Sequence, residues 1–537
     1  MFRKVWNLLP AKDRKTCIWV GLAVFIRALL DFASIAALLP ILVILLGDDP
    51  DKSKALLLCG AVLAFILLKN GLSIILTRFQ SKFLLRLYKY FSHKLFYNYY
   101  HRGLLFLKSK STAQLASEVN FICYAFSLNI LNQGIQLLGA MCLVVLMVGA
   151  LLWWAPLAGV LMCAGFLPIV AFYLLFVKKR TRRYGEEEIE ARRAQARTVN
   201  ETFRGFAELE VNGAYHQLEE AFLHGLDTIN QCRLRMELVH AVPPMLSEAA
   251  IVLGIALLLV FGQGDLRIMS GVFAIAAFRL IPAVRSIMSC WTVMRTYSHC
   301  VDIIADGIKD EATLQQNQQN IQFNKEIKVT ELNFTFPDGG QILNHFSLTI
   351  NKGECLGIKG PSGSGKSTLF NLLLGFYPAT SGAITIDGEQ LQPSNLQAWH
   401  RLVGYVPQEI FIMKGDLAQN IALGQTDIDE ECLLQVLEQV RLKEWVDTLP
   451  EGIHTPLGEF GSRLSGGQKQ RIGIARALYK QAEILFFDEA TSSLDNQTEM
   501  EVNQAIMDLS AHYQELTMVI IAHRESSLTC CHRVVSL

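Results

Sequence analysis

Six long apolar runs before about Met294 restrict what this chain can fold into more than any other feature of its sequence. Each run is near the ~20 residues that a helix needs to cross a ~30 Å hydrocarbon core. The runs are residues 18–46, 55–76, 131–154, 157–177, 245–262 and 268–291. The sequence therefore predicts a membrane α-helical part with six transmembrane helices. The lipid bilayer is then its first partner.

Charged residues next to these runs predict their orientation. Five basic residues precede the first run, and the strongly basic segment 178–183 follows the fourth. The short link 47–51 after the first run is acidic. Because Lys and Arg accumulate on the cytosolic side of a membrane, both ends of this half are expected in the cytosol.

The connections between the runs alternate in length. Three of them are short, whereas residues 77–130 and 178–244 form long links rich in helix-forming residues. At ~1.5 Å per residue, such links can extend ~35 Å from the membrane and return. They are either solvated helical hairpins or levers that touch a soluble module near residues 111–118 and 203–213. We favour levers, because the module needs physical contact with the membrane part.

A phosphate-binding loop follows the membrane half. Residues 360–368 read Gly-Pro-Ser-Gly-Ser-Gly-Lys-Ser-Thr, between a short apolar strand and an apolar helix start. Gly363 and Gly365 let backbone N–H groups turn inward, Lys366 adds a positive charge, and Ser367 offers a hydroxyl to Mg²⁺. The helix N-terminus favours the same anions. The residues expected to hold the nucleotide here are Gly360, Pro361, Ser362, Gly363, Ser364, Gly365, Lys366, Ser367 and Thr368.

Two acidic residues end a second apolar strand. Residues 484–487 are followed by Asp488 and Glu489. Such a strand is typical of a buried parallel sheet, whose carboxyl ends line a ligand crevice. We expect Asp488 to hold Mg²⁺ through water and Glu489 to polarise or deprotonate the water that attacks the γ-phosphate. Upstream, residues 464–468 form a Ser-Gly-Gly turn that caps a basic helix and offers further N–H groups to an anion.

In this order, the motifs make the second half resemble the nucleotide-binding domain of ATP-binding-cassette (ABC) proteins, and the whole chain resembles an exporter-type half-transporter. The resemblance identifies residues 360–367 as the Walker A loop and Asp488 with Glu489 as Walker B and its catalytic carboxylate. It makes Gln408 the residue that senses Mg²⁺ and His523 the switch histidine. The implied catalytic residues are Glu489, His523, Lys366 and Gln408, and the implied Mg²⁺ ligands are Ser367, Gln408 and Asp488.

The resemblance extends to shorter segments. Residues 464–468 match the family signature, residues 493–495 the dimer-contact loop, and residues 458–459 a loop that contacts the lever tips. Phe336 stands where the family usually has tyrosine and keeps a π-face for adenine. The chain ends at Leu537, so the module is expected to be shorter than usual. The signature residues implied to bind ATP are Ser465, Gly466, Gly467 and Gln468.

The resemblance also implies an organisation and an activity. Residues 1–305 would form a six-helix transmembrane domain of the ABC exporter type I fold with two long cytoplasmic extensions. Residues 306–321 would be a linker and residues 322–537 an α/β P-loop NTPase domain, the ABC nucleotide-binding domain. Because Ser465 and Gly467 complete the opposing module's site in this family, a head-to-tail homodimer is implied. The activity would be ATP hydrolysis coupled to transmembrane movement, as a multi-pass translocase of the inner (cytoplasmic) membrane.

Charge and cysteine content restrict other partners. The formal net charge is zero, so no overall electrostatic case for nucleic-acid binding exists. The twelve cysteines contain no Cys-x-x-Cys pair. Cys530, Cys531 and His532 look like ligands, but adjacent cysteines without a second cluster are not expected to make a zinc site.

Charged residues inside the apolar runs bear on the cargo. Arg27 and Asp31 lie in the first run, Lys69 in the second, and Arg279 and Arg285 in the sixth. A charge at the bilayer centre costs roughly 3 kcal/mol, so these side chains should pair, lie near an interface or face a cavity. One interpretation pairs Arg27 with Asp31 and extends the other cations to the helix ends. The other aligns the three arginines along a cavity for a phosphate or pyrophosphate head group.

Residues 278–285 and 203–213 resemble bacterial lipid-linked oligosaccharide flippases of the ABC family. The expected function is therefore an ATP-driven, homodimeric exporter or flippase, with a lipid-linked oligosaccharide as the first cargo. Export of a lipid, a lipopolysaccharide precursor or an amphipathic drug is the alternative within the same architecture. A membrane-tethered regulatory ATPase without cargo is the alternative from another class.

Overall fold

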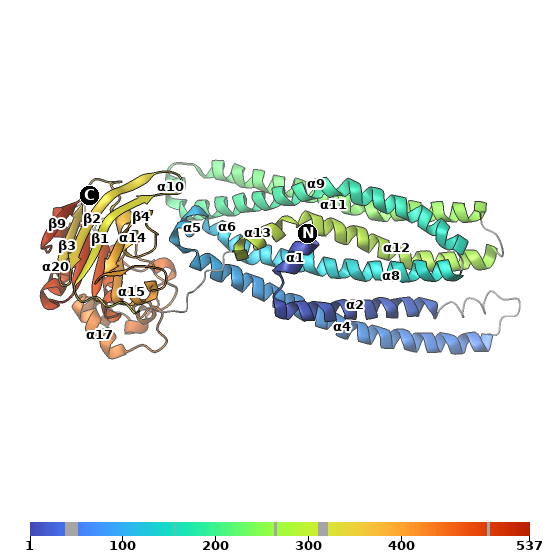
Figure 1. The fold of residues 1–537 in the computed structure, drawn as a ribbon, viewed down its shortest axis with the longest axis horizontal. Helices are drawn as coiled ribbons and strands as arrows, with labels where there is room; N and C mark the ends of the chain where they lie inside the picture. Colours follow the sequence, from blue (N-terminus) through green and yellow to red (C-terminus); the bar gives the residue numbers. More distant parts are fainter. Residues whose placement is uncertain (38–51, 155, 262–265, 310–319, 491–494, 523) are drawn as a thin grey trace. The chain divides into compact units, whose positions relative to one another are not determined.

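The computed structural model describes residues 1–537 apart from 38–51, 155, 262–265, 310–319, 491–494 and 523. The chain divides into two compact units (Figure 1). The helical unit comprises Met1–Arg102 and Phe106–Ala312, and the α/β unit comprises Gly103–Leu105 and Thr313–Leu537. Most of the predicted linker, 306–321, lies outside the described residues.

The helical unit contains only helices and turns among its described residues. Its helices are α1 (Phe2–Leu8), α2 (Ala11–Ala36), α4 (Lys52–His101), α5 (Gly103–Ser109), α6 (Thr112–Ser117), α7 (Cys123–Ala125), α8 (Asn132–Trp154), α9 (Pro156–Arg204), α10 (Phe206–Val211), α11 (Tyr215–Phe261), α12 (Leu266–Thr296) and α13 (His299–Lys309), with π-helical turns η1 (Glu118–Ile122) and η2 (Phe126–Leu131). The six apolar runs fall on α2, α4, α8, α9, α11 and α12. Part of the first run lies outside the described residues.

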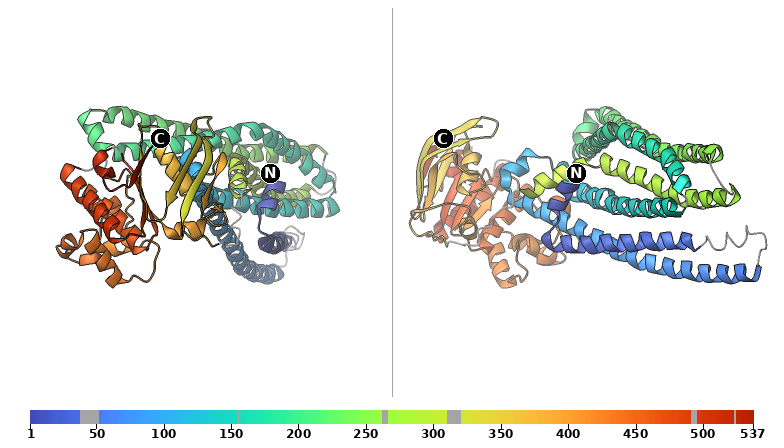
Figure 2. Two further views of the ribbon diagram at one scale, coloured as in Figure 1. Left: turned by 60° about the vertical axis from the view of Figure 1, so that its left-hand side comes forward. Right: turned by 45° about the vertical axis from the view of Figure 1, so that its right-hand side comes forward.

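Three long helices dominate this unit. Helix α4 has 50 residues, α9 has 49 and α11 has 47, so each continues well beyond its apolar run. Helices α9 and α11 lie side by side in both Figures 1 and 2 and are in contact. The two long links predicted from the sequence are therefore largely continuations of membrane-type helices.

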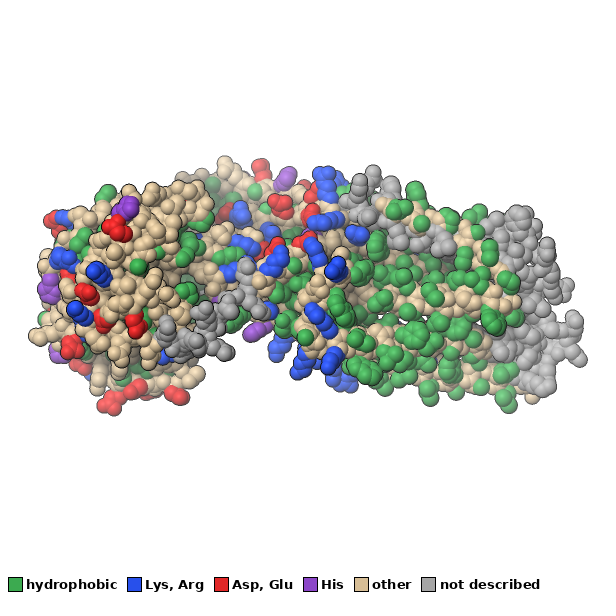
Figure 3. Space-filling model, in the orientation of Figure 1, with side chains coloured by type: hydrophobic (Ala, Val, Ile, Leu, Met, Phe, Trp, Pro, Cys, Tyr) green, Lys and Arg blue, Asp and Glu red, His purple; other side chains and the backbone are tan. Residues whose placement is uncertain are grey.

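The surface of the helical unit is apolar over much of its length. Figure 3 shows hydrophobic side chains spread over the face in view, with Lys and Arg side chains gathered at one end of this region. On α4, for example, Leu56, Leu67 and Ile74 are all exposed. By length and hydropathy, three spans among the described residues could cross a membrane: Ala11–Ser34, Leu56–His101 and Thr112–Trp154. An apolar surface of this size is expected to face lipid.

The α/β unit contains two sheets. Its strands are β1 (Glu326–Thr335), β2 (Gln341–Asn351), β3 (Cys355–Lys359), β4 (Ser381–Ile386), β5 (Glu389–Gln390), β6 (Val403–Val406), β7 (Ile484–Asp488), β8 (Thr517–Ile521) and β9 (Arg533–Ser536). Strands β2-β1-β4-β5 form an antiparallel sheet, and β6-β7-β8-β3-β9 form a parallel one. The two apolar strands predicted before the phosphate loop and before Asp488 are β3 and β7.

Helices and short turns connect these strands. They are α14 (Lys366–Leu373), α15 (Leu396–Leu402), α16 (Leu417–Ile421), α17 (Glu430–Gln439), α18 (Lys443–Asp447), η3 (Gly452–His454), η4 (Glu459–Gly461), α19 (Gly466–Tyr479), α20 (Asn496–His512) and η5 (Glu525–Leu528). Every residue of β7 and β8 is buried, as expected for central strands covered on both faces.

Strand β8 lies between β3 and β7, and this order positions the site. Ile521, the last residue of β8, is paired with Ile358 of β3 and with Asp488 of β7. The carboxyl ends of the three parallel strands therefore meet at one edge of the sheet. The phosphate loop follows β3 at this edge, and the two carboxylates lie at the end of β7.

Candidate functional site

The phosphate loop joins β3 to α14 through two glycines in left-handed conformations. Gly363 has φ 85° and Gly365, which caps α14, has φ 100°. A Cβ atom on Gly365 would lie 2.5 Å from Cγ2 of Ile342. Only glycine satisfies both the backbone angle and the space at this position. The two glycines therefore allow a sharp turn at the start of α14, and the N-terminus of a helix favours the binding of an anion.

Two polar side chains in the loop fit a phosphate ligand. Lys366 is buried, and its Nζ donates to the backbone oxygens of Gly360 at 3.0 Å and Pro361 at 2.9 Å. The Oγ atom of Ser364 is buried and has no hydrogen-bond partner among the described residues. Buried polar atoms normally have a partner, so the loop presents a cation and an unsatisfied hydroxyl where phosphate oxygens would lie.

Asp488 and Ser367 face each other across the sheet edge. Ser367 Oγ donates to Asp488 Oδ1 at 3.2 Å. Burial raises the pKa of Asp488, and the neighbouring charge of Glu489 raises it further, while the Ser367 hydrogen bond opposes both. A hydroxyl and a carboxylate are oxygen donors of the kind that Mg²⁺ prefers. The pair fits a magnesium site, and a bound cation would favour the charged form of Asp488.

Glu489 has an unusual backbone. Its φ is 51°, a left-handed conformation that is uncommon outside glycine. Its N–H donates to the carbonyl of Ile521 at 3.0 Å, which ties this turn to the end of β8. Its Oε2 accepts a long hydrogen bond of 3.4 Å from Nε2 of Gln408, which follows β6. Gln470 Nε2 donates to the backbone oxygen of Gln408 at 2.8 Å.

The predicted Ser-Gly-Gly helix cap is confirmed. Ser465 Oγ accepts from the N–H of Gln468 at 3.2 Å, and Gln468 Oε1 accepts from the N–H of Ser465 at 2.8 Å. This reciprocal pair begins α19. Ser465 and Gly466 are exposed, whereas Gly467 is buried and a Cβ there would collide with Cγ2 of Thr498. The turn is therefore packed on one side and open on the other.

Other predicted site residues have different surroundings. Phe336 is half-buried, and its ring contacts Phe334 and Tyr377 with centroid separations of 4.9 Å and 5.9 Å. Asp495 caps α20 by accepting from the N–H of Thr498 at 3.1 Å. His523 and the other two residues of the predicted dimer-contact loop lie outside the described residues.

Sequence reasoning missed Tyr405. This residue lies on β6, beside β7, and interacts with Asp488. Burial and the Asp488 carboxylate raise the pKa of Tyr405. A polar residue near the carboxyl end of a parallel strand was a usable signal, since such ends line the ligand crevice. Gln470 was also missed, because its role depends on a contact with Gln408 that lies far away in the sequence.

The charged residues of the apolar helices do not form the Arg27–Asp31 pair that one interpretation of the sequence predicted. Asp31 Oδ1 pairs with Lys69 Nζ at 2.8 Å, and Lys69 is buried. Arg27 does not pair with Asp31; its Nη1 donates to Thr77 Oγ1 at 3.4 Å. The expected pair within α2 is thus replaced by one between α2 and α4, because burial makes the neutralisation of Lys69 more important than that of an exposed arginine.

Of the three arginines expected to contact cargo, Arg285 has a charged neighbour. Its Nη2 lies 3.5 Å from Oε1 of Glu248. The side chain of Arg279 lies outside the described residues. The idea of a row of cations therefore stays a prediction.

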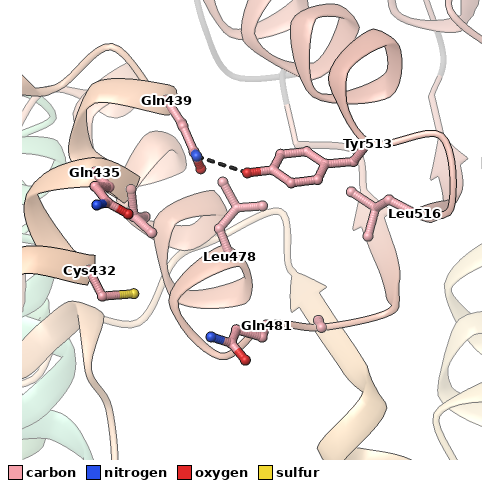
Figure 4. A pocket seen from close by; sticks show the side chains of 9 residues that line it. Cys432, Gln435, Gln439, Leu478, Gln481, Tyr513 and Leu516 are labelled. Carbon is pink, nitrogen blue, oxygen red and sulfur yellow. Dashed lines mark hydrogen bonds between the residues drawn. The ribbon is translucent and has the colours of Figure 1, made fainter. Parts of the chain in front are cut away.

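A pocket elsewhere in the α/β unit has a volume of about 380 Å³ (Figure 4). Gln439 Nε2 donates to the hydroxyl of Tyr513 at 2.8 Å in its wall, and Cys432 and Gln481 also line it. Among the described residues, its lining includes none of those predicted to bind ATP.

Comparisons with known proteins agree with this geometry. The family model described as ABC transporter matches residues 343–492. An ATP-dependent lipid A-core flippase of Polaromonas sp. is 30% identical over 448 residues, which cover 81% of this chain and 74% of that protein. Another, from Ralstonia nicotianae, is 31% identical over 388 residues, 70% of this chain and 65% of that protein.

Other similar proteins carry different names. The mitochondrial iron-sulfur clusters transporter of Candida albicans is 40% identical over 212 residues, which cover 40% of this chain and 28% of that protein. Two of these three alignments span less than two thirds of the relative. A solved structure of a bacterial Atm1-family ABC exporter with ATP bound matches with a TM-score of 0.79 and 19% identity, covering 98% of this chain and 94% of that chain.

Fold and site together define a multi-pass membrane protein with a fused nucleotide-binding domain of the P-loop type. The chain belongs to the ABC transporter family. Its fold is that of the solved ABC exporter, and one membrane-type helical unit and one ABC nucleotide-binding unit share a chain. The fold class expected from the sequence is thereby confirmed.

Proposed function

We propose that this chain hydrolyses ATP and uses the reaction to move an amphipathic lipid across a membrane. The observation that carries the proposal is the convergence of four side chains at one sheet edge. Lys366 and Ser367 come from the phosphate loop, Asp488 ends β7, and Glu489 directly follows it. Ser367 contacts Asp488 directly.

In this proposal, residues 360–368 hold the phosphate chain. Lys366 exchanges its two carbonyl partners for phosphate oxygens, and Ser364 gains the partner that it lacks. Ser367, Asp488 and Gln408 are the proposed Mg²⁺ ligands, directly or through water. When bound, the metal ion supplies charge neutralisation on the phosphate oxygens.

In the same proposal, Glu489 is the general base of the reaction. Its carboxylate accepts a proton from the attacking water, and the hydrogen bond from Gln408 orients the carboxylate. The left-handed backbone at Glu489 fixes where this side chain begins, because its N–H is held by Ile521. Phe336 is the proposed adenine platform and His523 the proposed γ-phosphate contact.

We further propose that two copies act together, head to tail. Ser465 and Gly466 are exposed at the N-terminus of a capped helix, and the positive end of a helix favours an anion from outside the chain. Together with Gly467 and Gln468 they would complete the ATP site of a second copy. The proposed location is the inner membrane, and the basic residues before the first apolar run and after the fourth favour both chain ends in the cytosol.

For the cargo, we propose a lipid with a phosphorylated sugar head group. The relatives named lipid A-core flippases support a lipid of this chemistry, which also includes the lipid-linked oligosaccharide first expected. Drug export is the second candidate. It is favoured by a 33% identical relative from Lactococcus lactis named a multidrug resistance ABC transporter, which aligns over 48% of this chain.

Reconstitution in liposomes tests these functions. Phosphate release would be measured with lipid A-core, with a lipid-linked oligosaccharide and with a cationic amphipathic drug, and lipid movement would be followed by quenching of a head-group label. We expect stimulation and ATP-dependent movement with the phosphorylated glycolipids and not in Glu489→Gln. Stimulation by the drug alone would support drug export instead. Steady hydrolysis that no amphiphile alters would support the regulatory ATPase.

A further inference from the structure

Three cysteine side chains meet at the amino end of β3. The Sγ atoms of Cys355, Cys530 and Cys531 all lie within 4.8 Å of one another. Cys355 Sγ lies 3.9 Å from Cys530 Sγ and 3.7 Å from Cys531 Sγ. Cys355 begins the strand that leads to the phosphate loop, and the other two precede β9. None of them belongs to the proposed ATP site.

The sulfur separations match those of a metal–thiolate site. With metal–sulfur bonds of ~2.3 Å in tetrahedral geometry, two ligand sulfurs are separated by ~3.8 Å. The separations of 3.9 Å and 3.7 Å agree with this value. A disulfide would need ~2.05 Å and could join only two of the three thiols.

The pairing of β9 with β3 builds this arrangement. Leu356 of β3 is paired with Arg533 of β9, which brings residues 530–532 next to Cys355. The N–H of His532 donates to the carbonyl of Cys355 at 2.8 Å, and the N–H of Cys355 donates to Nδ1 of His532 at 3.0 Å. The backbone on both sides of the cluster is therefore fixed, as a preformed ligand set requires.

The surroundings of the cluster leave room for the thiols and give access from solvent. Gly357 has no side chain, and a Cβ there would lie 3.0 Å from Leu528 Cδ2 and 3.2 Å from both Cys531 Sγ and Val534 Cγ2. Cys355 is 1% exposed, whereas Cys530 and Cys531 are half-buried. A cation could thus enter from the side of the two later cysteines, and water could supply a fourth ligand there.

We propose that Cys355, Cys530 and Cys531 form a binding site for one thiophilic d¹⁰ cation of the Zn²⁺ or Cu⁺ kind. Soft thiolate ligands select such ions over Mg²⁺ or Ca²⁺. Binding displaces the thiol protons, and each sulfur becomes a thiolate ligand with no change of oxidation state. Because the ligands come from β3 and from the segment before β9, the ion holds the edge strand β9 on the sheet.

From the sequence, Cys530 and Cys531 were not expected to form a metal site, and the proposed site differs from that expectation. Cys530 and Cys531 lack a second cluster nearby in the chain, and the third thiol comes from 175 residues earlier. His532 is used differently from a ligand, because its Nδ1 accepts the Cys355 N–H. Only the parallel pairing of two distant strands brings the three sulfurs together.

Cadmium titration of the full chain, purified in detergent with a phosphine reductant, tests the proposal. Cd²⁺ replaces Zn²⁺ at thiolates and gives an ultraviolet sulfur-to-metal absorption band. We expect one Cd²⁺ per chain, bound competitively with Zn²⁺. Cys530→Ser and Cys531→Ser should each bind about 10-fold more weakly or worse. Cys432→Ser, which changes a half-buried thiol in the pocket of Figure 4, is the matched control and should bind as the unaltered chain does.

A second variant leaves every ligand in place. Gly357→Ala puts a methyl group against the Cys531 sulfur and the side chains of Leu528 and Val534, and it should weaken Cd²⁺ binding while the chain stays folded, as judged by circular dichroism. Zn²⁺ should also raise the melting temperature of the unaltered chain and not that of Cys530→Ser. Absence of a stoichiometric band, or an equal band in Cys530→Ser and Cys531→Ser, would overturn the proposal. Neither result bears on ATP hydrolysis, which is measured separately.

Discussion

Neutralising Asp31 should destabilise the helical unit strongly. Lys69 Nζ and Asp31 Oδ1 are 2.8 Å apart, and the two side chains are 8% and 31% exposed. Asp31→Asn keeps the shape of the side chain and removes its charge. Lys69 would then be a buried cation without a counter-charge on α2, in a helix pair whose outer surface is apolar.

The size of the effect follows from this geometry. At 2.8 Å, with an effective dielectric constant of about 20, the attraction is roughly 6 kcal/mol before desolvation is subtracted. Removing one partner of a buried ion pair typically costs about 3–5 kcal/mol. Because Asp31 is partly exposed, we expect about 3 kcal/mol for Asp31→Asn, roughly a hundredfold in the unfolding equilibrium.

A double-mutant cycle measures this energy. The unaltered chain, Asp31→Asn, Lys69→Met and the double variant would be unfolded reversibly in mixed micelles, with helix content followed by circular dichroism. The double variant should recover to within about 1 kcal/mol of the unaltered chain, since it leaves no unpaired charge. Arg27→Gln is the matched control on the same helix, and it should cost under about 1 kcal/mol, because that exposed side chain loses one long hydrogen bond. Single variants that each cost less than about 1 kcal/mol and add up in the double variant would refute the reasoning.

Three further predictions concern the α/β unit. Glu489→Gln should lower ATP turnover by about 10²–10⁴-fold while nucleotide binding persists, and unimpaired phosphate release would contradict its role as a base. Gly365→Ala should abolish binding of a fluorescent ATP analogue, because φ 100° and the 2.5 Å approach to Ile342 both exclude a side chain; normal binding would show that the loop can relax. Asp387 accepts the N–H groups of residues 324–326. Burial opposes these hydrogen bonds, but together they lower the pKa of Asp387 below 3.8. Its stabilising contribution should thus be complete above pH ~4 and disappear as pH falls through the lowered pKa. Asp387→Ala should therefore lower the melting temperature at pH 7, and a gap that does not shrink as pH is lowered below about 4 would count against this linkage.

The local parts of the site could be read from the sequence. The phosphate loop, the Asp488–Glu489 pair and the cap at Ser465 each depend on neighbouring residues, whose types determine the turn, strand end or helix start. Each occurs in the structure where the pattern predicts it. The six apolar runs likewise lie on helices, because hydrophobicity over ~20 residues is a local property.

Contacts between distant segments could not be read in the same way. Asp31 of α2 pairs with Lys69 of α4. The i, i+4 spacing in the sequence favoured Arg27 instead, because that spacing relates residues of one helix only. Tyr405 reaches Asp488 through the pairing of β6 with β7. The thiol of Cys355 joins Cys530 only through the pairing of β3 with β9. Sequence patterns do not specify such pairings without knowledge of strand order.

The position of β8 has a consequence for how this site tolerates change. The two groups of residues that would grip opposite sides of a nucleotide's phosphates stand on strands separated by β8 alone, about 10 Å apart at ~4.8 Å per strand. The distance between the two groups is therefore set by β8, a fully buried strand, and not by the loops that carry the groups. Substitutions on the surface of this unit should leave that distance unchanged, whereas a bulkier side chain at Ile520 should displace both groups at once.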